Sequence, residues 1–236
     1  MRHLSVLTSA VLLAAISSAA GGNAAAQREC WGNFERYAAD NARVAALPLS
    51  ERRVVFMGNS ITDFWPGNHP SFFADNHFIG RGISGQSTYQ FLSRFRDDVI
   101  NLRPELVVLN AATNDCAENT HPYDPDRTMG NIISMCELAR AAGIKVILTS
   151  TLPAAAFYWN PSITDAAGRI SDLNRRIRVY AENNSIPYVD YYTAMVHGAD
   201  RALNPDYTAD GVHPNAQGYA VMEALILPAI QKALGE

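Results

Sequence analysis

The chain has 236 residues, of which 48% are hydrophobic and 18% charged, and its formal net charge is −4. Its length suffices for one α/β domain with a full core, and the composition is that of an ordinary globular protein. The mild acidity and the lack of a basic patch argue against nucleic acid as a partner. The cysteines, Cys30, Cys116 and Cys136, are odd in number without a C-x-x-C pair, which argues against structural zinc and leaves one unassigned disulfide open.

The first 26 residues have the layout of a secretory signal peptide. A single basic residue, Arg2, precedes an apolar run from Val11 to Ile16, and small residues follow up to Ala26. The apolar run is shorter than the ~20 residues that a membrane span needs. We therefore expect cleavage before Gln27, export to the periplasm or the outside of the cell, no stable membrane anchor, and a single domain over residues 27–236.

Beyond this segment, apolar strand-like runs alternate with amphipathic helical stretches. Strands are predicted at Val54–Met57, His77–Ile79, Leu106–Asn110, Lys145–Ser150 and Tyr188–Asp190. Helices are predicted over residues 30–46, 87–101, 126–142, 164–184 and 215–234, and loops over 60–76, 111–125, 152–163 and 191–213. This alternation predicts an α/β fold, a three-layer α/β/α sandwich around a central, mostly parallel five-stranded sheet. Polar segments that follow the strands should then meet at one edge of the sheet.

The first such segment is "FMGNSITDFW", in which a buried run stops at Gly58 and delivers Ser60 to the strand end. Ser60 can be a nucleophile there, or it can cap a following helix. The stretch is not a G-x-S-x-G elbow, because Thr62 stands where that motif has glycine.

Two further segments could supply hydrogen-bond donors. In "GRGISGQST", residues 80–88, glycines surround Ser84, so that backbone N–H groups can face an anion. The alternative is an ordinary turn between a strand and a helix, because many such turns have a similar sequence. After the run that ends at Asn110, the amide of Asn114 could donate to a developing negative charge, or it could belong to an ordinary turn.

Near the C-terminus, Asp210 and His213 lie three residues apart in "YTADGVHPNAQGY". This spacing lets the carboxylate hold one imidazole nitrogen while the other nitrogen acts as a general base. An aspartate that merely closes the turn is the alternative. His69, His77, His121 and His197 are scattered without a metal-binding pattern, so we expect no metal and no cofactor.

In this order, the segments resemble the SGNH hydrolase family, also called GDSL esterases and lipases, over the whole mature chain. The matching residues are Gly58-Asn59-Ser60, Gly82-Ile83-Ser84-Gly85, Thr113-Asn114-Asp115 and Asp210-Gly211-Val212-His213-Pro214. The resemblance implies a flavodoxin-like sheet with Ser60 as nucleophile, His213 as base and Asp210 orienting the imidazole. It also implies that the N–H groups of Ser60 and Gly85 and the amide of Asn114 bind the oxyanion.

Three positions depart from the family pattern. Asn59 stands where aspartate is usual, Ala112 stands where glycine is usual, and Gly80 stands where close relatives often carry asparagine. None of the three removes a catalytic group, although Ala112 is expected to tighten the turn before Asn114.

The substrate is less closely defined by the sequence. "GNSIT" and "RGISGQ" resemble the branch of platelet-activating-factor acetylhydrolase-like enzymes, and export with aromatic residues in two loops fits a small or glycan ester. Those residues, Trp65, His69, Phe157, Tyr158 and Trp159, could line a sugar or acyl cleft or could pack beneath their loops. We predict a secreted serine esterase for acetyl or short-chain esters, with O-acetylated carbohydrates as candidates. A lysophospholipase or thioesterase, an acyltransferase, and a non-catalytic carbohydrate-binding protein are the alternatives.

Overall fold

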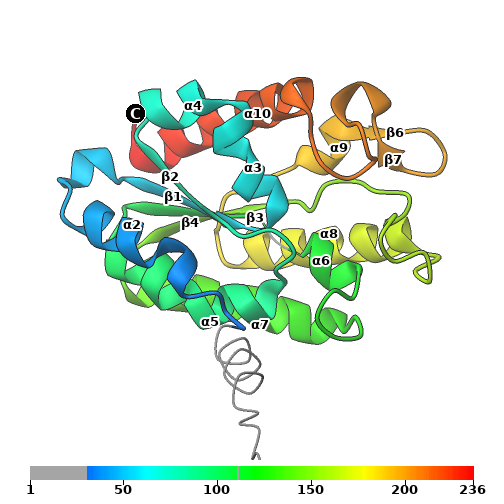
Figure 1. Cartoon of the computed structure of the whole chain (residues 1–236), viewed down its shortest axis with the longest axis horizontal. Helices are drawn as coiled ribbons and strands as arrows, with labels where there is room; N and C mark the ends of the chain where they lie inside the picture. The colour runs from blue at the N-terminus through cyan, green and yellow to red at the C-terminus, as the bar shows by residue number, and fades with distance from the viewer. Residues whose placement is uncertain (1–30, 111) are drawn as a thin grey trace, which may run out of the picture. The chain divides into compact units, whose positions relative to one another are not determined.

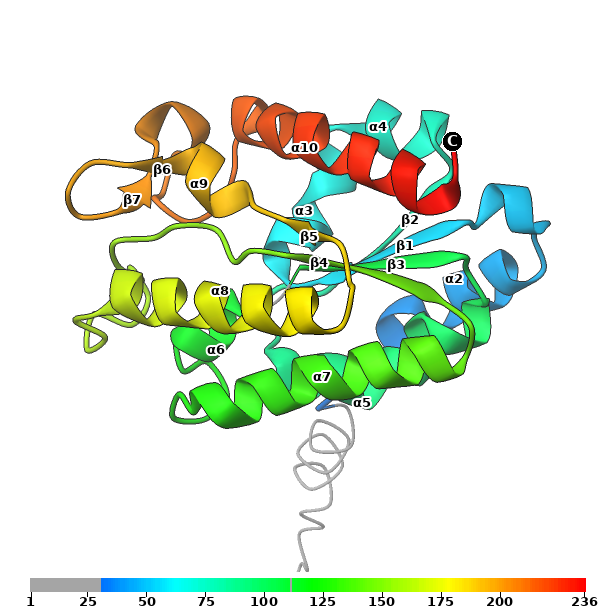
Figure 2. The ribbon, with the colours of Figure 1, turned by 180° about the vertical axis from the view of Figure 1, so that it is seen from behind.

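A parallel five-stranded sheet forms the centre of the fold (Figures 1 and 2). The computed structural model describes residues 31–110 and 112–236, of which residues 32–236 form one compact unit. The strands are β1 (Val54–Gly58), β2 (Phe78–Gly82), β3 (Leu106–Asn110), β4 (Lys145–Thr149) and β5 (Tyr188–Val189). Their order is β2-β1-β3-β4-β5, and every neighbouring pair is parallel, which is the flavodoxin-like arrangement. The predicted fold class is confirmed.

The register of the sheet aligns the carboxyl ends of three strands. Gly58, the last residue of β1, pairs with Gly82 of β2 on one side and with Asn110 of β3 on the other. Every residue of β1 and β3 is buried, as expected for strands covered on both faces. The segments that follow β1, β2 and β3 therefore start side by side at one edge.

Helices cover both faces of the sheet. One layer holds α2 (Glu35–Ala45), α5 (Thr88–Asp98), α7 (Pro125–Ala141) and α8 (Ala166–Asn183), and the other holds α3 (Ser60–Asn68), α4 (Pro70–Asp75) and α10 (Ala216–Leu234) (Figure 1). Each layer closes its own apolar core against the sheet. Phe91 of α5 and Ile132 of α7 belong to the first core, and Trp65 of α3 and Met222 of α10 belong to the second.

Helix ends follow the local sequence. Ser87 caps α5 in a capping box, because its side chain accepts the N–H of Gln90 while the Gln90 side chain accepts the N–H of Ser87. Gly143, with φ +74°, follows the end of α7.

The expected loop over residues 60–76 is wrong, because it contains α3 and α4. Pro66 and Gly67 inside α3 and Pro70 at the first turn of α4 conceal the helical period. The loop expected over 111–125 contains the short α6 (Thr113–Cys116). The region 191–213 contains α9 (Tyr191–Met195), the antiparallel pair β6 (Val196–His197) and β7 (Ala202–Leu203), and a 3₁₀ turn at Pro205–Tyr207. β2 begins at Phe78 because His77, with φ +54°, cannot extend the strand.

The segment expected to be a signal peptide lies outside the described residues, as does Cys30. Cys116 and Cys136 are buried free thiols, and burial raises the pKa of the Cys136 thiol to about 12. None of the helices in the described residues combines the length and apolar character that a membrane crossing requires.

Candidate active site

Ser60 lies at the junction between a strand and a helix. β1 ends at Gly58, and Asn59 caps α3 by accepting the N–H of Ile61 on its side-chain oxygen at 3.0 Å. Ser60 is thus the first residue of α3, not its cap, and only 8% of it is exposed. An N–H in the first turn of a helix has no partner within the helix, and the positive end of the helix dipole lies there. The same position can therefore offer a hydroxyl and an anion-binding N–H.

His213 connects Ser60 to Asp210 through two hydrogen bonds. The Ser60 Oγ lies 2.8 Å from His213 Nε2, and His213 Nδ1 lies 2.7 Å from Asp210 Oδ2. Ser60 and His213 lie 153 residues apart in the chain. In this arrangement the imidazole can take the serine proton while the carboxylate stabilises the resulting cation. The structure brings together the three residues that the sequence singled out.

The loop before α10 fixes the carboxylate relative to the imidazole. The other oxygen of Asp210 accepts the backbone N–H groups of Val212 at 2.9 Å and His213 at 2.8 Å. The Thr208 hydroxyl donates to the carbonyl of His213 at 2.7 Å and closes the turn. Burial raises the pKa of Asp210, but the hydrogen bonds from His213 and Val212 outweigh it and hold the pKa at about 2. Asp210 is therefore ionised throughout the neutral range.

The turn after β2 packs directly on the first turn of α3. A Cβ at Gly82 would lie 2.1 Å from the backbone nitrogen of Asp63, so only glycine fits. The Asp63 carboxylate accepts the N–H of Ser84 at 3.1 Å and its hydroxyl at 2.7 Å. Gly85 follows with φ +79°, and no described residue accepts its N–H or that of Ser60. Ser84 is thus held as a structural residue, and Gly85 is left with a free donor.

Asn114 joins this group from the turn after β3. Its side-chain amide donates one hydrogen to the carbonyl of Gln86 at 2.9 Å, which leaves the second hydrogen for a ligand. Ala112, two residues earlier, adopts the left-handed conformation with φ +85°, which is strained for any residue with a Cβ. Ala112, which stands where the family usually has glycine, therefore adopts a backbone conformation that favours glycine.

Arg94 connects these turns through hydrogen bonds, and no motif in the sequence predicted this role. The residue is 1% exposed, and its guanidinium donates to the carbonyls of Gly58 at 3.1 Å and Arg81 at 3.0 Å and to the side chain of Gln86 at 2.6 Å. Asp98, one helical turn later on α5, pairs with it at 2.6 Å. Burial lowers the pKa of Arg94, and Asp98 opposes that change. One buried ion pair thus fixes the positions of the carboxyl ends of β1 and β2 and of Gln86, whose carbonyl accepts the Asn114 amide.

The aromatic residues of the loops separate into two groups. Trp65 and Phe157 are 1% and 0% exposed and belong to the cores, while His69 pairs with Glu223 at 2.9 Å. Tyr158 and Trp159, in contrast, are exposed. The packing alternative therefore holds for the first three residues and not for these two.

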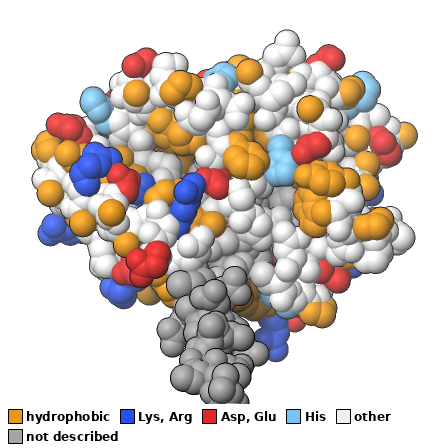
Figure 3. Space-filling view, in the orientation of Figure 1, with side chains coloured by type: hydrophobic (Ala, Val, Ile, Leu, Met, Phe, Trp, Pro, Cys, Tyr) orange, Lys and Arg blue, Asp and Glu red, His pale blue; other side chains and the backbone are white. Residues whose placement is uncertain are grey.

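Exposed rings flank the imidazole of His213. The Phe64 ring of α3 lies 5.5 Å from the His213 ring, and the Trp159 ring lies 6.5 Å from it, between ring centroids. Figure 3 shows a face on which a histidine lies beside an acidic side chain, with hydrophobic side chains on both sides.

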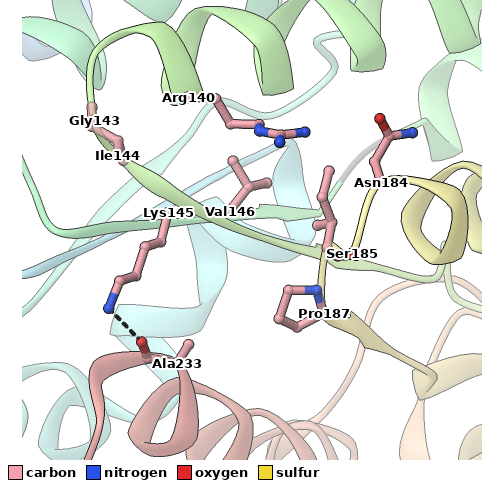
Figure 4. A pocket seen from close by; sticks show the side chains of 10 residues that line it. Arg140, Gly143, Ile144, Lys145, Val146, Asn184, Ser185, Pro187 and Ala233 are labelled. Atoms are coloured by element: carbon pink, nitrogen blue, oxygen red, sulfur yellow. Dashed lines mark hydrogen bonds between the residues drawn. The ribbon is translucent and has the colours of Figure 1, made fainter.

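A separate hollow of about 490 Å³ lies near the amino ends of β4 and β5 (Figure 4). Its ten lining residues include no acid and no histidine. Lys145 donates to the carbonyl of Ala233 in the last turn of α10 at 2.7 Å, and Arg140 lies in the last turn of α7, where a cation complements the helix dipole. These two charges therefore lie at helix ends, where they complement the helix dipoles. No group of three or more potential metal ligands occurs within the described residues.

Known proteins are similar to this chain in sequence and in fold. The family model of GDSL-like lipases and acylhydrolases matches residues 56–221. A GDSL-like lipase from Bacteroides thetaiotaomicron has 60% sequence identity and a TM-score of 0.84, covering 86% of this chain and 98% of that one. An acetylxylan esterase from Xylanibacter ruminicola is 21% identical over 214 residues, which cover 76% of this chain and 43% of that protein. The chain thus spans less than half of that relative. The acetylxylan esterase Axe2 from Geobacillus stearothermophilus, at 17% identity and a TM-score of 0.60, covers 78% of this chain and 94% of its own and shares the fold.

Proposed function

Because the chain belongs to the GDSL-like lipase/acylhydrolase family and is a carboxylic ester hydrolase, we propose that it is a serine esterase with Ser60 as nucleophile. Its substrates are acetyl or short-chain esters, among them O-acetylated carbohydrates. The observation that carries the proposal is the pair of hydrogen bonds that connects Ser60 to His213 and His213 to Asp210 at the edge of the sheet. The free N–H groups of Ser60 and Gly85 and the amide of Asn114 complete the site.

Acylation begins when Ser60 Oγ attacks the ester carbonyl carbon while His213 Nε2 takes its proton. The carbonyl π electrons move to oxygen, and this oxyanion accepts hydrogen bonds from the three donors. Collapse of the intermediate breaks the bond to the alcohol oxygen, which leaves with the proton from His213. Water then attacks the acyl-serine with His213 as base, and the carboxylic acid leaves as Ser60 regains its proton.

Two observations support small acyl groups and exported substrates. Two of the similar proteins are acetylxylan esterases by name. The N-terminal sequence has the layout of a signal peptide, so we propose that the enzyme acts in the periplasm or outside the cell.

The test is hydrolysis of 4-nitrophenyl esters of increasing chain length by the mature protein and by Ser60→Ala. We expect the highest kcat/KM on acetate and a loss on the order of 10⁶-fold in kcat for the variant, as in other serine triads. Ser93→Ala, at an exposed position on α5, serves as the matched control and should keep full activity. A preference for long chains would indicate a lysophospholipase, and turnover by folded Ser60→Ala at the wild-type rate would reject the nucleophile.

A further inference from the structure

We propose that Phe64, Tyr158 and Trp159 form an alcohol-side subsite that binds the apolar face of a sugar ring carrying the ester. This inference rests on the proposed roles of Ser60 and His213. It assigns the exposed aromatic rings to one part of the substrate and leaves the acyl group to the opposite side.

The direction of proton transfer decides which part of the ester lies beside these rings. His213 must return its proton to the alcohol oxygen as the ester bond breaks, so that oxygen comes within hydrogen-bond reach of Nε2. The carbonyl oxygen, in contrast, faces the donors of Gly85 and Asn114. Because the rings of Phe64 and Trp159 lie 5.5 and 6.5 Å from the imidazole, they flank the alcohol.

The three rings are exposed and therefore accessible to a ligand. Phe64 is 44% exposed, Tyr158 62% and Trp159 36%, although the two cores hold large buried aromatic residues such as Trp65. Phe157, fully buried, anchors the loop, and its ring lies 5.4 Å from that of Trp159. Aromatic faces carry negative charge and attract the weakly positive C–H groups on the flat face of a pyranose. A flexible glycerol alcohol offers no such face.

Hydrogen bonds fix this subsite relative to the oxyanion donors. The indole N–H of Trp159 donates to the Asn119 side-chain oxygen at 2.8 Å. The Asn119 amide donates to the carbonyl of Gly85 at 3.3 Å, and its backbone N–H donates to the carbonyl of Asn114 at 3.0 Å. A sugar ring on Trp159 is therefore held at a set distance from the groups that bind the carbonyl oxygen.

The test compares two acetyl esters that differ only in the alcohol, a monoacetylated methyl xylopyranoside and ethyl acetate. We expect Trp159→Ala to lower the ratio of kcat/KM for the sugar ester to that for ethyl acetate by about tenfold. Trp159→Phe keeps a ring but loses the N–H, so it should keep the ratio within about threefold while kcat falls for both esters. Val179→Ala, at an exposed position on α8, is the control and should change neither rate.

A second measurement does not depend on turnover. In the Ser60→Ala background, the affinity for the acetylated xyloside, measured by calorimetry, should fall about tenfold on adding Trp159→Ala. If Trp159→Ala changes neither the ratio of the two kcat/KM values nor the affinity for the acetylated xyloside, the subsite is wrong. Hydrolysis of 4-nitrophenyl acetate by the same protein would then show that the proposed function stands without the subsite. A folded wild-type protein that hydrolyses none of these esters would overturn the proposed function and the subsite with it.

Discussion

Replacing Arg94 by methionine should lower the free energy of unfolding by about 3–5 kcal/mol, the usual cost of removing one partner of a buried ion pair. Both charges lie inside the protein, with Arg94 1% and Asp98 3% exposed. Methionine fills the space of the arginine stem, so the cost comes from charge and not from a cavity. Among the described residues, Asp98 would keep only Asn41 as a hydrogen-bond donor, and the carbonyl of Arg81 would lose its bond from the guanidinium.

Urea denaturation followed by tryptophan fluorescence measures this loss. Arg96→Met on the exposed side of the same helix is the control and should change stability by less than about 0.5 kcal/mol. The double variant Arg94→Met/Asp98→Leu removes both charges and should recover most of the stability. Its kcat should stay about tenfold or more below wild type, because the side-chain oxygen of Gln86 loses its bond from Arg94 and the side chain keeps only its bond to the carbonyl of Gly32 among the described residues.

Two results would refute this reasoning. A loss below about 1 kcal/mol in Arg94→Met would mean that the carboxylate of Asp98 is easily solvated or protonated. Full kcat in the stable double variant would mean that the ion pair only balances charge and does not position the active-site turns.

Substitutions at three positions test the site further. Asn114→Ala should lower kcat by about 10²–10³-fold, the usual cost of one oxyanion donor, and an unchanged kcat would remove it from that role. The pKa of Asp210 lies below its ordinary value, so its contribution to stability is complete above pH 4 and is lost as the pH falls toward 2. Asp210→Asn should accordingly lose less Tm over that interval than wild type, and equal losses would contradict the assignment. Ala112→Gly relieves strain but frees the unfolded chain, so stability should change by less than about 1 kcal/mol, whereas Ala112→Val should cost more than about 2 kcal/mol; thermal denaturation of the two variants decides.

The strands were predicted closely because a strand that is buried on both faces has a continuous run of apolar residues. The runs at Val54 and Leu106 are continuous and apolar, and they appear as β1 and β3 with the expected starts. α3 and α4 were missed because Pro66 lies inside α3, where proline usually breaks a helix, and Pro70 opens α4 only two residues after α3 ends.

The residues proposed for chemistry were predicted, whereas the residues that position them were not. Ser60, Asn114 and His213 stand in short motifs that depend on local spacing. Arg94 and Asp98, by contrast, are four residues apart on an amphipathic helix, which is the pattern of an ordinary exposed ion pair. Only the folded chain shows that this side of α5 faces the ends of β1 and β2. A buried charged residue such as Arg94 can be predicted from sequence only when the groups that it contacts in the fold are known.

The loop that carries Asp210 and His213 has a consequence for biosynthesis. These two residues are local to one another, but they meet Ser60 only when α10 docks on α3, where Tyr219 donates to the carbonyl of Ile61 at 2.8 Å and Trp65 donates to Glu223 at 2.9 Å. On the roles proposed, a nascent chain that has emerged only to β5 already holds its nucleophile and oxyanion donors, yet it has no base. On the same roles, hydrolysis begins only after α10 has left the ribosome and packed on α3, so the order of translation itself delays activity.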